Sequence, residues 1–225
     1  IEKPIGLNTC ESREFVEYCS KKGLITQVNY TRRTDDLMKK LCSGELINRI
    51  GKIQCGFGVY GNGLLNYASH TIDLVRMIIG EITAVQALKQ TRIIKPGPIS
   101  SDINIPFILY VNNIQITLYP IDFSFYREGS LDLWGEQGRL EILQEGLILR
   151  TNETNRCRSL NKAKEINFDI TNKVSTGYGK AFYNLYDDFA NSIHQDSRKT
   201  ASNVQSALVN EEIVEAIIFS SNNNG

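Results

Sequence analysis

Three polar side chains recur at helical spacing within residues 64–79: Asn66, His70 and Asp73. An α-helix turns by roughly 100° per residue, so this spacing predicts that they share one helix face, within roughly 60° of each other. The opposite side carries residues that would pack on a sheet: Ala68, Thr71, Ile72, Val75, Ile78 and Ile79. A histidine on such a polar face is a candidate proton acceptor, because its unperturbed pKa lies near neutrality.

Two interpretations of this polar face stay open on the sequence alone. Most polar helix faces are solvated, and this one could be as well. A solvated face is usually rich in Lys and Glu, whereas this face offers Asn, His and Asp with Met77 beside them. Small hydrogen-bonding groups of this kind suit the lining of a cleft.

Glycines 56, 58 and 61 form a G-x-G-x-x-G pattern after a predicted strand and before a predicted helix, which could indicate a dinucleotide-binding loop. Two features argue against that interpretation. Asn62-Gly63 separates the pattern from the helix, and Glu81 precedes the next strand instead of ending it. A flexible entry loop is the preferred interpretation.

Other charged residues point to chemistry less directly. Arg32 and Arg33 follow a predicted strand that would end at a cleft, and surface solvation and anion binding are equally open for them. His194 lies near the end of a predicted helix, where a cation complements the helix dipole, so a structural role is favoured. Three adjacent acidic pairs are predicted to be solvated, because neighbours on a helix point in different directions: Asp35-Asp36, Asp187-Asp188 and Glu211-Glu212.

The composition limits the partners. The chain has 225 residues, with 25 Lys and Arg against 25 Asp and Glu, so its formal net charge is zero. Evenly spread charges provide no electrostatic footprint for nucleic acid or anionic lipid. No apolar run approaches the roughly 18 residues of a membrane span. Residue 1 is Ile with no cleavage signal after it, so we expect a soluble and truncated chain.

The cysteines indicate the compartment. They form an odd set of five, with no CxxC pair and no His at ligand spacing: Cys10, Cys19, Cys42, Cys55 and Cys157. This pattern argues against a disulfide framework or a zinc site, so we expect a reducing cytoplasm and no metal. The N-x-S/T matches at Asn29 and Asn152 are then chance occurrences.

Helices and strands alternate in the first part of the chain. Residues 8–23 are predicted to be helical, with Asn8 as the cap, Glu11 at the capping-box position and Gly23 after the end. We then expect a strand over 24–30, a short helix from Thr34 to a stop at Gly44, a strand over 50–59 and a helix over 64–79.

The middle of the chain is typical of a β-meander, with predicted strands over 82–88, 105–111, 114–121, 131–134 and 140–143. Asn112-Asn113 and Gly135 to Gly138 suit tight turns, so a mainly antiparallel sheet is expected. Helical periodicity returns at 182–193 and 204–218, and the tail 220–225 is expected to fray.

Several separated motifs together resemble those of one family. They are Glu2-Lys3-Pro4, Val28-Asn29-Tyr30 followed by Arg32-Arg33, the run from Gly63 to Leu74, and the run from Leu131 to Leu140. In order and spacing, and in the last two helices, the chain is similar to the Gfo/Idh/MocA oxidoreductases over nearly its whole length.

This resemblance implies an α+β fold class: a large, mainly antiparallel sheet with helices packed on one face, preceded by the residual end of a Rossmann domain. Residues 1–30 would be that residual end of the NAD(P)-binding domain, whose front half the chain would lack. Residues 31–225 would form the substrate-binding and oligomerisation domain. The open sheet face would then mediate a homodimer or homotetramer.

The resemblance also implies roles for single residues. Lys3 matches the family lysine that contacts the nicotinamide side and the reacting oxygen, and Glu2, Lys3 and Pro4 would contact the cofactor, NAD or NADP. His70 matches the family histidine that acts as general base or acid. Asn66 stands where many members carry Asp, so acid–base work would fall on His70 and Lys3. Asn66 would orient substrate hydroxyls, and the remaining substrate contacts would come from Asp73, Arg32 and Arg33.

The activity implied is an NAD(P)-dependent dehydrogenase acting on CH–OH groups of a sugar, sugar nucleotide or polyol, with His70 and Lys3 exchanging the hydroxyl proton. Two alternatives stay open. Asn66 motivates a catalytically silent binding or assembly module of the same fold. Family members that act as glycosidases or as a bile-pigment reductase motivate a different reaction with the same cofactor.

Overall fold

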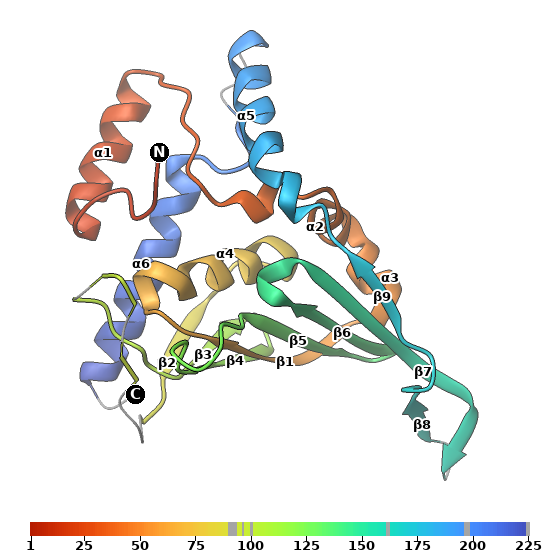
Figure 1. Ribbon diagram of the computed structural model, residues 1–225. Coiled ribbons are helices and arrows are strands. Elements are labelled where there is room, and N and C mark those ends of the chain that lie inside the picture. The colour runs from red at the N-terminus through yellow and green to blue at the C-terminus, as the bar shows by residue number, and fades with distance from the viewer. Residues whose placement is uncertain (90–93, 96, 100, 161–162, 196–198, 224–225) are drawn as a thin grey trace.

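A computed structural model describes residues 1–89, 94–95, 97–99, 101–160, 163–195 and 199–223, with the side chains of 156–160 and 163 outside that description. The chain forms a layer of helices that gathers on one side of a single large sheet, and the other side of the sheet carries no described helix (Figure 1). The α+β fold class with helices on one face is therefore confirmed. Residues 224–225 of the tail lie outside the described ranges.

Nine strands make up the sheet within the described residues. They are β1 (Ile53–Tyr60), β2 (Ala84–Ala87), β3 (Phe107–Val111), β4 (Ile114–Pro120), β5 (Ser130–Gly135), β6 (Gly138–Leu143), β7 (Ile148–Leu160), β8 (Ala163–Ile166) and β9 (Asn172–Ser175). Their order is β2-β3-β4-β1-β5-β6-β7-β8, with β9 paired to β7.

The pairing is mainly antiparallel, as the meander predicts. One pair, β1 with β4, is parallel and places Gly56 beside Ile116, whereas β1 and β5 are antiparallel and place Gly56 beside Leu133. All the remaining pairs are antiparallel. Asn112 has φ 53° in the turn between β3 and β4, which confirms that tight turn.

The glycine pattern at 56, 58 and 61 lies within and directly after β1, so the interpretation as a flexible entry loop is wrong. A Cβ atom on Gly56 would lie 2.6 Å from Ile116 Cδ1, and one on Gly58 would lie 2.5 Å from the Ser130 carbonyl oxygen. The neighbouring strands approach β1 so closely that only glycine fits at these positions.

The helices are α1 (Thr9–Lys21), α2 (Asp36–Lys40), α3 (Leu46–Ile50), α4 (Ser69–Ile78), α5 (Tyr178–His194) and α6 (Val204–Asn222). Two short 3₁₀ segments, η1 (Thr31–Thr34) and η4 (Gln144–Gly146), and two π turns, η2 (Leu41–Glu45) and η3 (Leu64–Ala68), lie between them. As predicted, Asn8 caps α1 by accepting a hydrogen bond from the Glu11 amide at 3.0 Å.

One predicted element differs from the structure. Residues 24–30 form no strand: their polar groups pair with the loop before α6, through Val28 N to Ser202 O at 2.7 Å and Thr200 Oγ1 to Thr26 O at 2.6 Å. No strand neighbour lies beside this segment in the described chain. The helical stop predicted at Gly44 is confirmed: Gly44 has non-helical backbone angles, with φ 108°, and a separate helical segment that contains α3 follows the kink.

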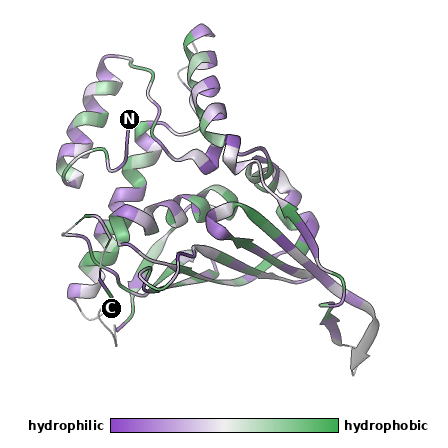
Figure 2. Cartoon of the chain, in the orientation of Figure 1, coloured by the Kyte–Doolittle hydropathy of each residue, from purple (hydrophilic) through white to green (hydrophobic). Residues whose placement is uncertain are grey.

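Apolar residues concentrate along the central strands and on the helices that cover them (Figure 2). On β3, Phe107, Leu109 and Val111 are buried while Ile108 and Tyr110 are partly exposed, the alternation of a sheet with one covered face. A second, smaller cluster joins α1 to α6 and to the segment before η1: Val16, Cys19, Val28, Tyr30, Val204 and Ala207. This cluster attaches residues 1–30 to the rest of the chain.

The adjacent acidic pairs are solvated only in part. In each pair one carboxylate is exposed or half-exposed, and the other accepts hydrogen bonds from backbone amides. Asp35 caps α2, Asp188 accepts from the Ala201 amide, and Glu211 accepts from the Ile5 amide. The prediction of solvation is therefore wrong for these three. The neighbours do point in different directions, and one direction leads into the protein.

Four cysteines are free thiols, and the side chain of Cys157 lies outside the description. Among the described residues, no group of three or more His, Cys, Asp or Glu side chains could hold a metal ion. No described helix is long and apolar enough to cross a membrane.

Candidate active site around Lys3 and His70

The start of the helix that carries the candidate site is held from two directions. Lys3 Nζ donates hydrogen bonds to the carbonyl oxygens of Leu65, at 3.3 Å, and Asn66. The Asp102 carboxylate accepts from the amides of the same two residues, at 3.1 Å and 2.9 Å. Lys3, from the N-terminal segment, is thereby fixed beside the η3 turn that leads into α4.

Gly63 makes this arrangement possible. Its φ is 97°, and a Cβ atom there would collide with the Asp102 carboxylate. Its amide donates to Asn104 Oδ1 at 2.9 Å, and the Asn104 amide group donates in turn to the carbonyl oxygen of Lys95 at 2.8 Å. The loop before β3 therefore sets the position of the helix start.

His70 lies beside two buried tyrosines. The centroid of its ring is 5.5 Å from that of Tyr30 and 6.4 Å from that of Tyr67, both edge to face. Its Nδ1 atom is buried and has no hydrogen-bond partner among the described residues. Burial, and then the charges of Arg32, Lys3 and Arg127, hold the pKa of His70 well below its usual range, so the imidazole is neutral at physiological pH.

Burial also lowers the pKa of Lys3, but here the nearest charges mainly oppose the shift. Burial lowers its pKa to about 8, and the carboxylates of Asp102 and Glu2 oppose that shift while Arg32 adds to it. A lysine with this pKa gains and loses its proton close to neutral pH. Lys3 and His70 therefore form a pair of proton-exchanging groups with different charges in one place.

A pocket of about 330 Å³ opens at this pair, and its walls are Glu2, Lys3, Asn29, Thr31, His70, Tyr178 and Phe182. A larger pocket of about 560 Å³ shares Glu2, Asn29 and Phe182 with it but is otherwise mainly apolar, with side chains of α1 and α5. The smaller pocket is the better candidate site, because it alone contains the two proton-exchanging groups.

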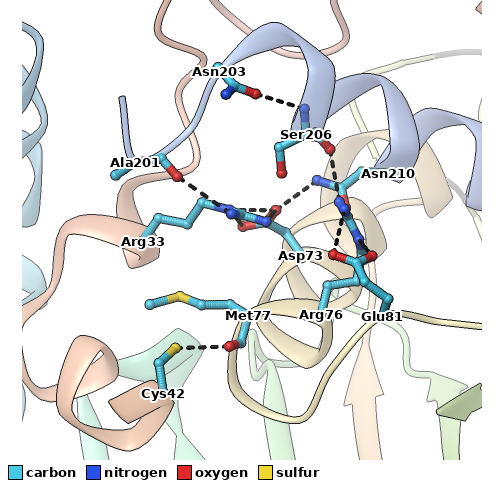
Figure 3. Close-up of polar contacts among 10 residues, drawn as sticks. All are labelled: Arg33, Cys42, Asp73, Arg76, Met77, Glu81, Ala201, Asn203, Ser206 and Asn210. Atoms are coloured by element: carbon cyan, nitrogen blue, oxygen red, sulfur yellow. Dashed lines mark hydrogen bonds and ion pairs between the residues drawn. The ribbon is translucent and has the colours of Figure 1, made fainter. Parts of the chain in front are cut away.

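Asp73 does not share this pocket, so the expectation of one open face for Asn66, His70 and Asp73 is wrong for Asp73. It is 2% exposed and forms an ion pair with Arg33, with Arg33 Nη2 at 2.8 Å from Oδ1. Asn210 Nδ2 on α6 also donates to it at 2.8 Å (Figure 3). His70 and Asp73 both lie in the regular helix α4, so the helix period itself is kept between them. Asp73 is removed from the pocket because Arg33 of η1 and Asn210 of α6 cover it.

The same network removes Arg33 from the candidate substrate site, because its guanidinium is occupied by Asp73 and by the Ala201 carbonyl oxygen (Figure 3). Arg76 extends the network by bonding Asn210 Oδ1 and Glu81. These contacts join η1, α4 and α6, so Arg33 and Asp73 have a structural role.

Of the other residues predicted for the site, some lie at the pocket and some do not. Glu2 lines the pocket while Pro4 does not, and Asn66 contributes its backbone carbonyl to Lys3. Arg32 is buried and lies near His70, whose pKa it lowers. Sequence reasoning missed Asp102, Asn104 and Tyr178. Asp102 and Asn104 follow a segment with no periodicity, and Tyr178 begins α5 ahead of the apolar repeat that marks that helix, so none carried a local signal.

The chain is 24% identical to scyllo-inositol 2-dehydrogenase (NAD(+)) of Bacillus subtilis, over 95% of the chain and 65% of that protein. The chain thus spans a little less than two thirds of that relative. No family model matches the chain.

Solved structures share its fold. A super-repressor mutant of Gal80p from Saccharomyces cerevisiae superimposes with a TM-score of 0.75 at 10% identity, over all of this chain and 70% of that one. Levoglucosan dehydrogenase in complex with NADH and levoglucosan superimposes with a TM-score of 0.73 at 17% identity, over all of this chain and 71% of that one.

Proposed function

The chain has the fold of the C-terminal domain of Gfo/Idh/MocA-type oxidoreductases, and on that premise we propose that the intact protein is an NAD(P)-dependent dehydrogenase. Its substrate would be a CH–OH group of a sugar, sugar nucleotide or polyol. The observation that carries the proposal is the joining of Lys3 and His70 at one pocket by two segments far apart in the sequence. The names of two similar proteins, an inositol dehydrogenase and a levoglucosan dehydrogenase, support it.

The residues present fit one end of a nicotinamide cofactor. Lys3 and Glu2 stand at a pocket of about 330 Å³, and the Lys3 ammonium has no carboxylate at ion-pair distance among the described residues. Gly56 and Gly58 cannot cradle a pyrophosphate, because they are packed inside the sheet. We therefore assign to this chain the nicotinamide side of the site only, and expect the diphosphate contacts to come from a Rossmann domain in the intact protein. Bound NAD(P) would supply the hydride acceptor.

The chain's own residues would manage the proton. Neutral His70 can accept a hydrogen bond from the reacting hydroxyl and then its proton, since one ring nitrogen of a neutral imidazole has a free lone pair. The Lys3 ammonium would favour the developing alkoxide and, with a pKa of about 8, can pass a proton to solvent near neutral pH. Asn66 would orient substrate hydroxyls beside this pair.

A second candidate function is a catalytically silent binding module. The fold it shares with Gal80p favours it, as does Asn66 in place of an acid. The helix-free face of the sheet would serve such a module as a homodimer or homotetramer interface, since Phe57 and Tyr119 are exposed there among ion-paired side chains. Binding by such a catalytically silent module would require neither Lys3 nor His70.

The test is turnover of sugars and polyols by the intact protein, followed as NAD(P)H formation. Lys3→Ala and His70→Ala should each reduce kcat/KM by about 10²- to 10⁴-fold, the range typical of a lost acid–base group. His194→Ala, at the exposed end of α5, is the matched control and should retain full activity. Unchanged turnover in both Lys3→Ala and His70→Ala would remove the assignment, and cofactor binding without turnover of any sugar would favour the silent module.

A further inference from the structure

Arg32 is a buried arginine without an acidic partner. Its side chain is 6% exposed, and no carboxylate of the described residues lies at ion-pair distance from it. Every other arginine whose side chain the structure describes does form an ion pair: Arg13, Arg33, Arg49, Arg76, Arg127, Arg139 and Arg150. A buried charge without a counter-ion is costly, so the site has a place for an anion that the described chain does not fill.

The guanidinium of Arg32 is nevertheless held firmly. Its Nε donates to the Glu145 carbonyl oxygen at 2.8 Å, and its central carbon lies 4.9 Å from the centroid of the Tyr178 ring. The two terminal nitrogens, Nη1 and Nη2, have no acceptor among the described residues. Arg32 is therefore fixed by its inner nitrogen and by stacking, while the pair of donors at its outer edge is unused.

The acid nearest to Arg32 is directed elsewhere. Gln144 and Glu145 both have left-handed backbones, with φ of 50° and 61°, and such conformations are unfavourable for residues other than glycine. This turn gives the Glu145 carbonyl oxygen to Arg32 and the Glu145 carboxylate to Arg127. The backbone is thus bent in a way that leaves the charge of Arg32 uncompensated.

The side chain of Arg32 lines a small cavity of about 10 Å³, and two residues in contact with it or next to it lead to the pocket of Lys3 and His70. Tyr178, on which it stacks, and Thr31, its neighbour in the chain, both line that pocket. Among the charges that lower the pKa of His70, that of Arg32 has the largest effect. An anion that reached the outer edge of Arg32 would therefore lie beside the proposed reacting groups.

Resting on the proposed function, we propose that the substrate is a sugar acid, whose carboxylate binds Nη1 and Nη2 of Arg32 while one of its hydroxyls lies at Lys3 and His70. A carboxylate matches two parallel N–H donors with its two oxygens, and its single charge balances the single charge of Arg32. A phosphate dianion would need a second cation beside Arg32. Arg127 is already paired with Glu145, and the Lys3 ammonium donates to the carbonyl oxygens of Leu65 and Asn66.

A bound carboxylate would also change His70. It would offset the Arg32 charge, the strongest of the charges that depress the pKa of His70, and so raise that pKa toward neutrality. The imidazole would then accept a proton more readily when the correct substrate is in place. Substrate selection and acid–base chemistry would depend on the same arginine.

The experiment compares matched pairs of substrates with the intact protein and NAD(P): glucuronate with glucose, galacturonate with galactose, and glucose 6-phosphate as the phosphate probe. Wild type should prefer each uronate over its neutral partner by about 10- to 100-fold in kcat/KM, as expected for hydrogen bonds to a charged group. Arg32→Gln should abolish that preference, and Arg32→Lys should retain part of it. Arg13→Gln, on the exposed surface of α1, should leave it unchanged.

Calorimetric binding of the same sugars separates this proposal from the proposed function. Binding of a uronate that is lost in Arg32→Gln, without turnover, would support the carboxylate site and overturn the dehydrogenase assignment. Equal use or equal binding of uronates and neutral sugars by wild type would overturn the carboxylate site, whether or not turnover occurs. A preference for glucose 6-phosphate would overturn it as well. Equal melting temperatures of wild type, Arg32→Gln and Arg32→Lys would show that any lost preference is not a loss of fold.

Discussion

Lys3 and Asp102 hold the same two residues from opposite sides: the ammonium binds the carbonyl oxygens of Leu65 and Asn66, and the carboxylate binds their amides. A positive charge near the carbonyl end of a peptide dipole and a negative charge near its amide end each stabilise the peptide. The position of Lys3 is therefore tied to the carboxylate of Asp102, which lies about a hundred residues later in the chain.

Asp102→Asn tests this relationship. The amide retains one acceptor oxygen, so at least one backbone N–H is left unsatisfied, and we expect a loss of about 1–3 kcal/mol in the free energy of unfolding. The carboxylate raises the pKa of Lys3, so its removal should lower that pKa below about 8. Urea unfolding and NMR titration of the Lys3 amine would measure the two effects. Asp187→Asn, on the exposed side of α5, is the control, and an unchanged Lys3 titration in Asp102→Asn would refute the coupling.

His70 should make stability depend on pH. Its pKa is depressed in the folded state, whereas a histidine in the unfolded chain titrates near pH 6.5. As the pH falls below that value, the unfolded chain binds a proton that the folded chain does not, so stability is lost by up to about 1.4 kcal/mol per pH unit. His70→Gln should remove this loss between pH 7.5 and pH 5.5 in urea unfolding. His194→Gln should retain it, since His194 is exposed, and identical pH profiles for wild type and His70→Gln would contradict the prediction.

The ion pair of Arg33 and Asp73 should stabilise the fold without taking part in catalysis. Asp73→Ala leaves the half-buried Arg33 without its carboxylate, and breaking a buried pair in this way costs about 3–5 kcal/mol. Chemical denaturation would show the loss. Arg13→Ala removes an exposed ion pair and should leave the midpoint nearly unchanged. Equal effects of the two substitutions would mean that the Asp73 site is not buried as described.

Substitutions of Gly58 and Gly179 together test whether the glycines of β1 are closely packed by the neighbouring strands. Gly58→Ala places a Cβ atom 2.5 Å from the Ser130 carbonyl oxygen, so overpacking should cost about 1–3 kcal/mol. Gly179→Ala, near the start of α5, meets no atom within 4 Å and should stabilise by about 0.4–1 kcal/mol. Thermal denaturation compares them. If Gly58→Ala were as stable as wild type, the interpretation of this segment as a flexible loop would be supported instead.

The chain of 225 residues should bind NAD weakly or not at all by calorimetry. On the proposed function it would supply only the Lys3 side of a nicotinamide site, and the glycines of β1 are not free to hold a pyrophosphate. Titration with NAD up to millimolar concentration is the measurement. Micromolar affinity would overturn this expectation and make Gly56 to Gly61 a nucleotide loop after all.

Periodicity and turn chemistry predict much of the fold. The alternation along β3 and the tight turn at Asn112 follow from local rules, and so does the Asn8 cap of α1. Residues 24–30 show the limit of those rules, because an apolar run forms a strand only where a neighbouring strand is present.

The candidate site is less predictable than the fold. The residue type and the family resemblance predict a role for His70, and the resemblance alone predicts one for Lys3. The separation of Asp73 from them depends on its contacts with Arg33 and Asn210, which come from other elements. Arg32 and Arg33 are adjacent and alike in the sequence, and only their surroundings distinguish them: one has a carboxylate and the other does not. The role of such a residue depends on its contacts with segments far apart in the sequence, and a local sequence pattern does not show those contacts.

β1 has a consequence for how the sheet assembles. Within the described sheet it is the strand that joins β4 to β5, whereas β3–β4, β5–β6 and β6–β7 are each joined through a short turn. Hairpins of that kind close small loops and form early, while the pairs of β1 bring together residues separated by more than fifty positions. We therefore expect the two meanders to form on their own and the folding rate to depend on when β1 enters between them.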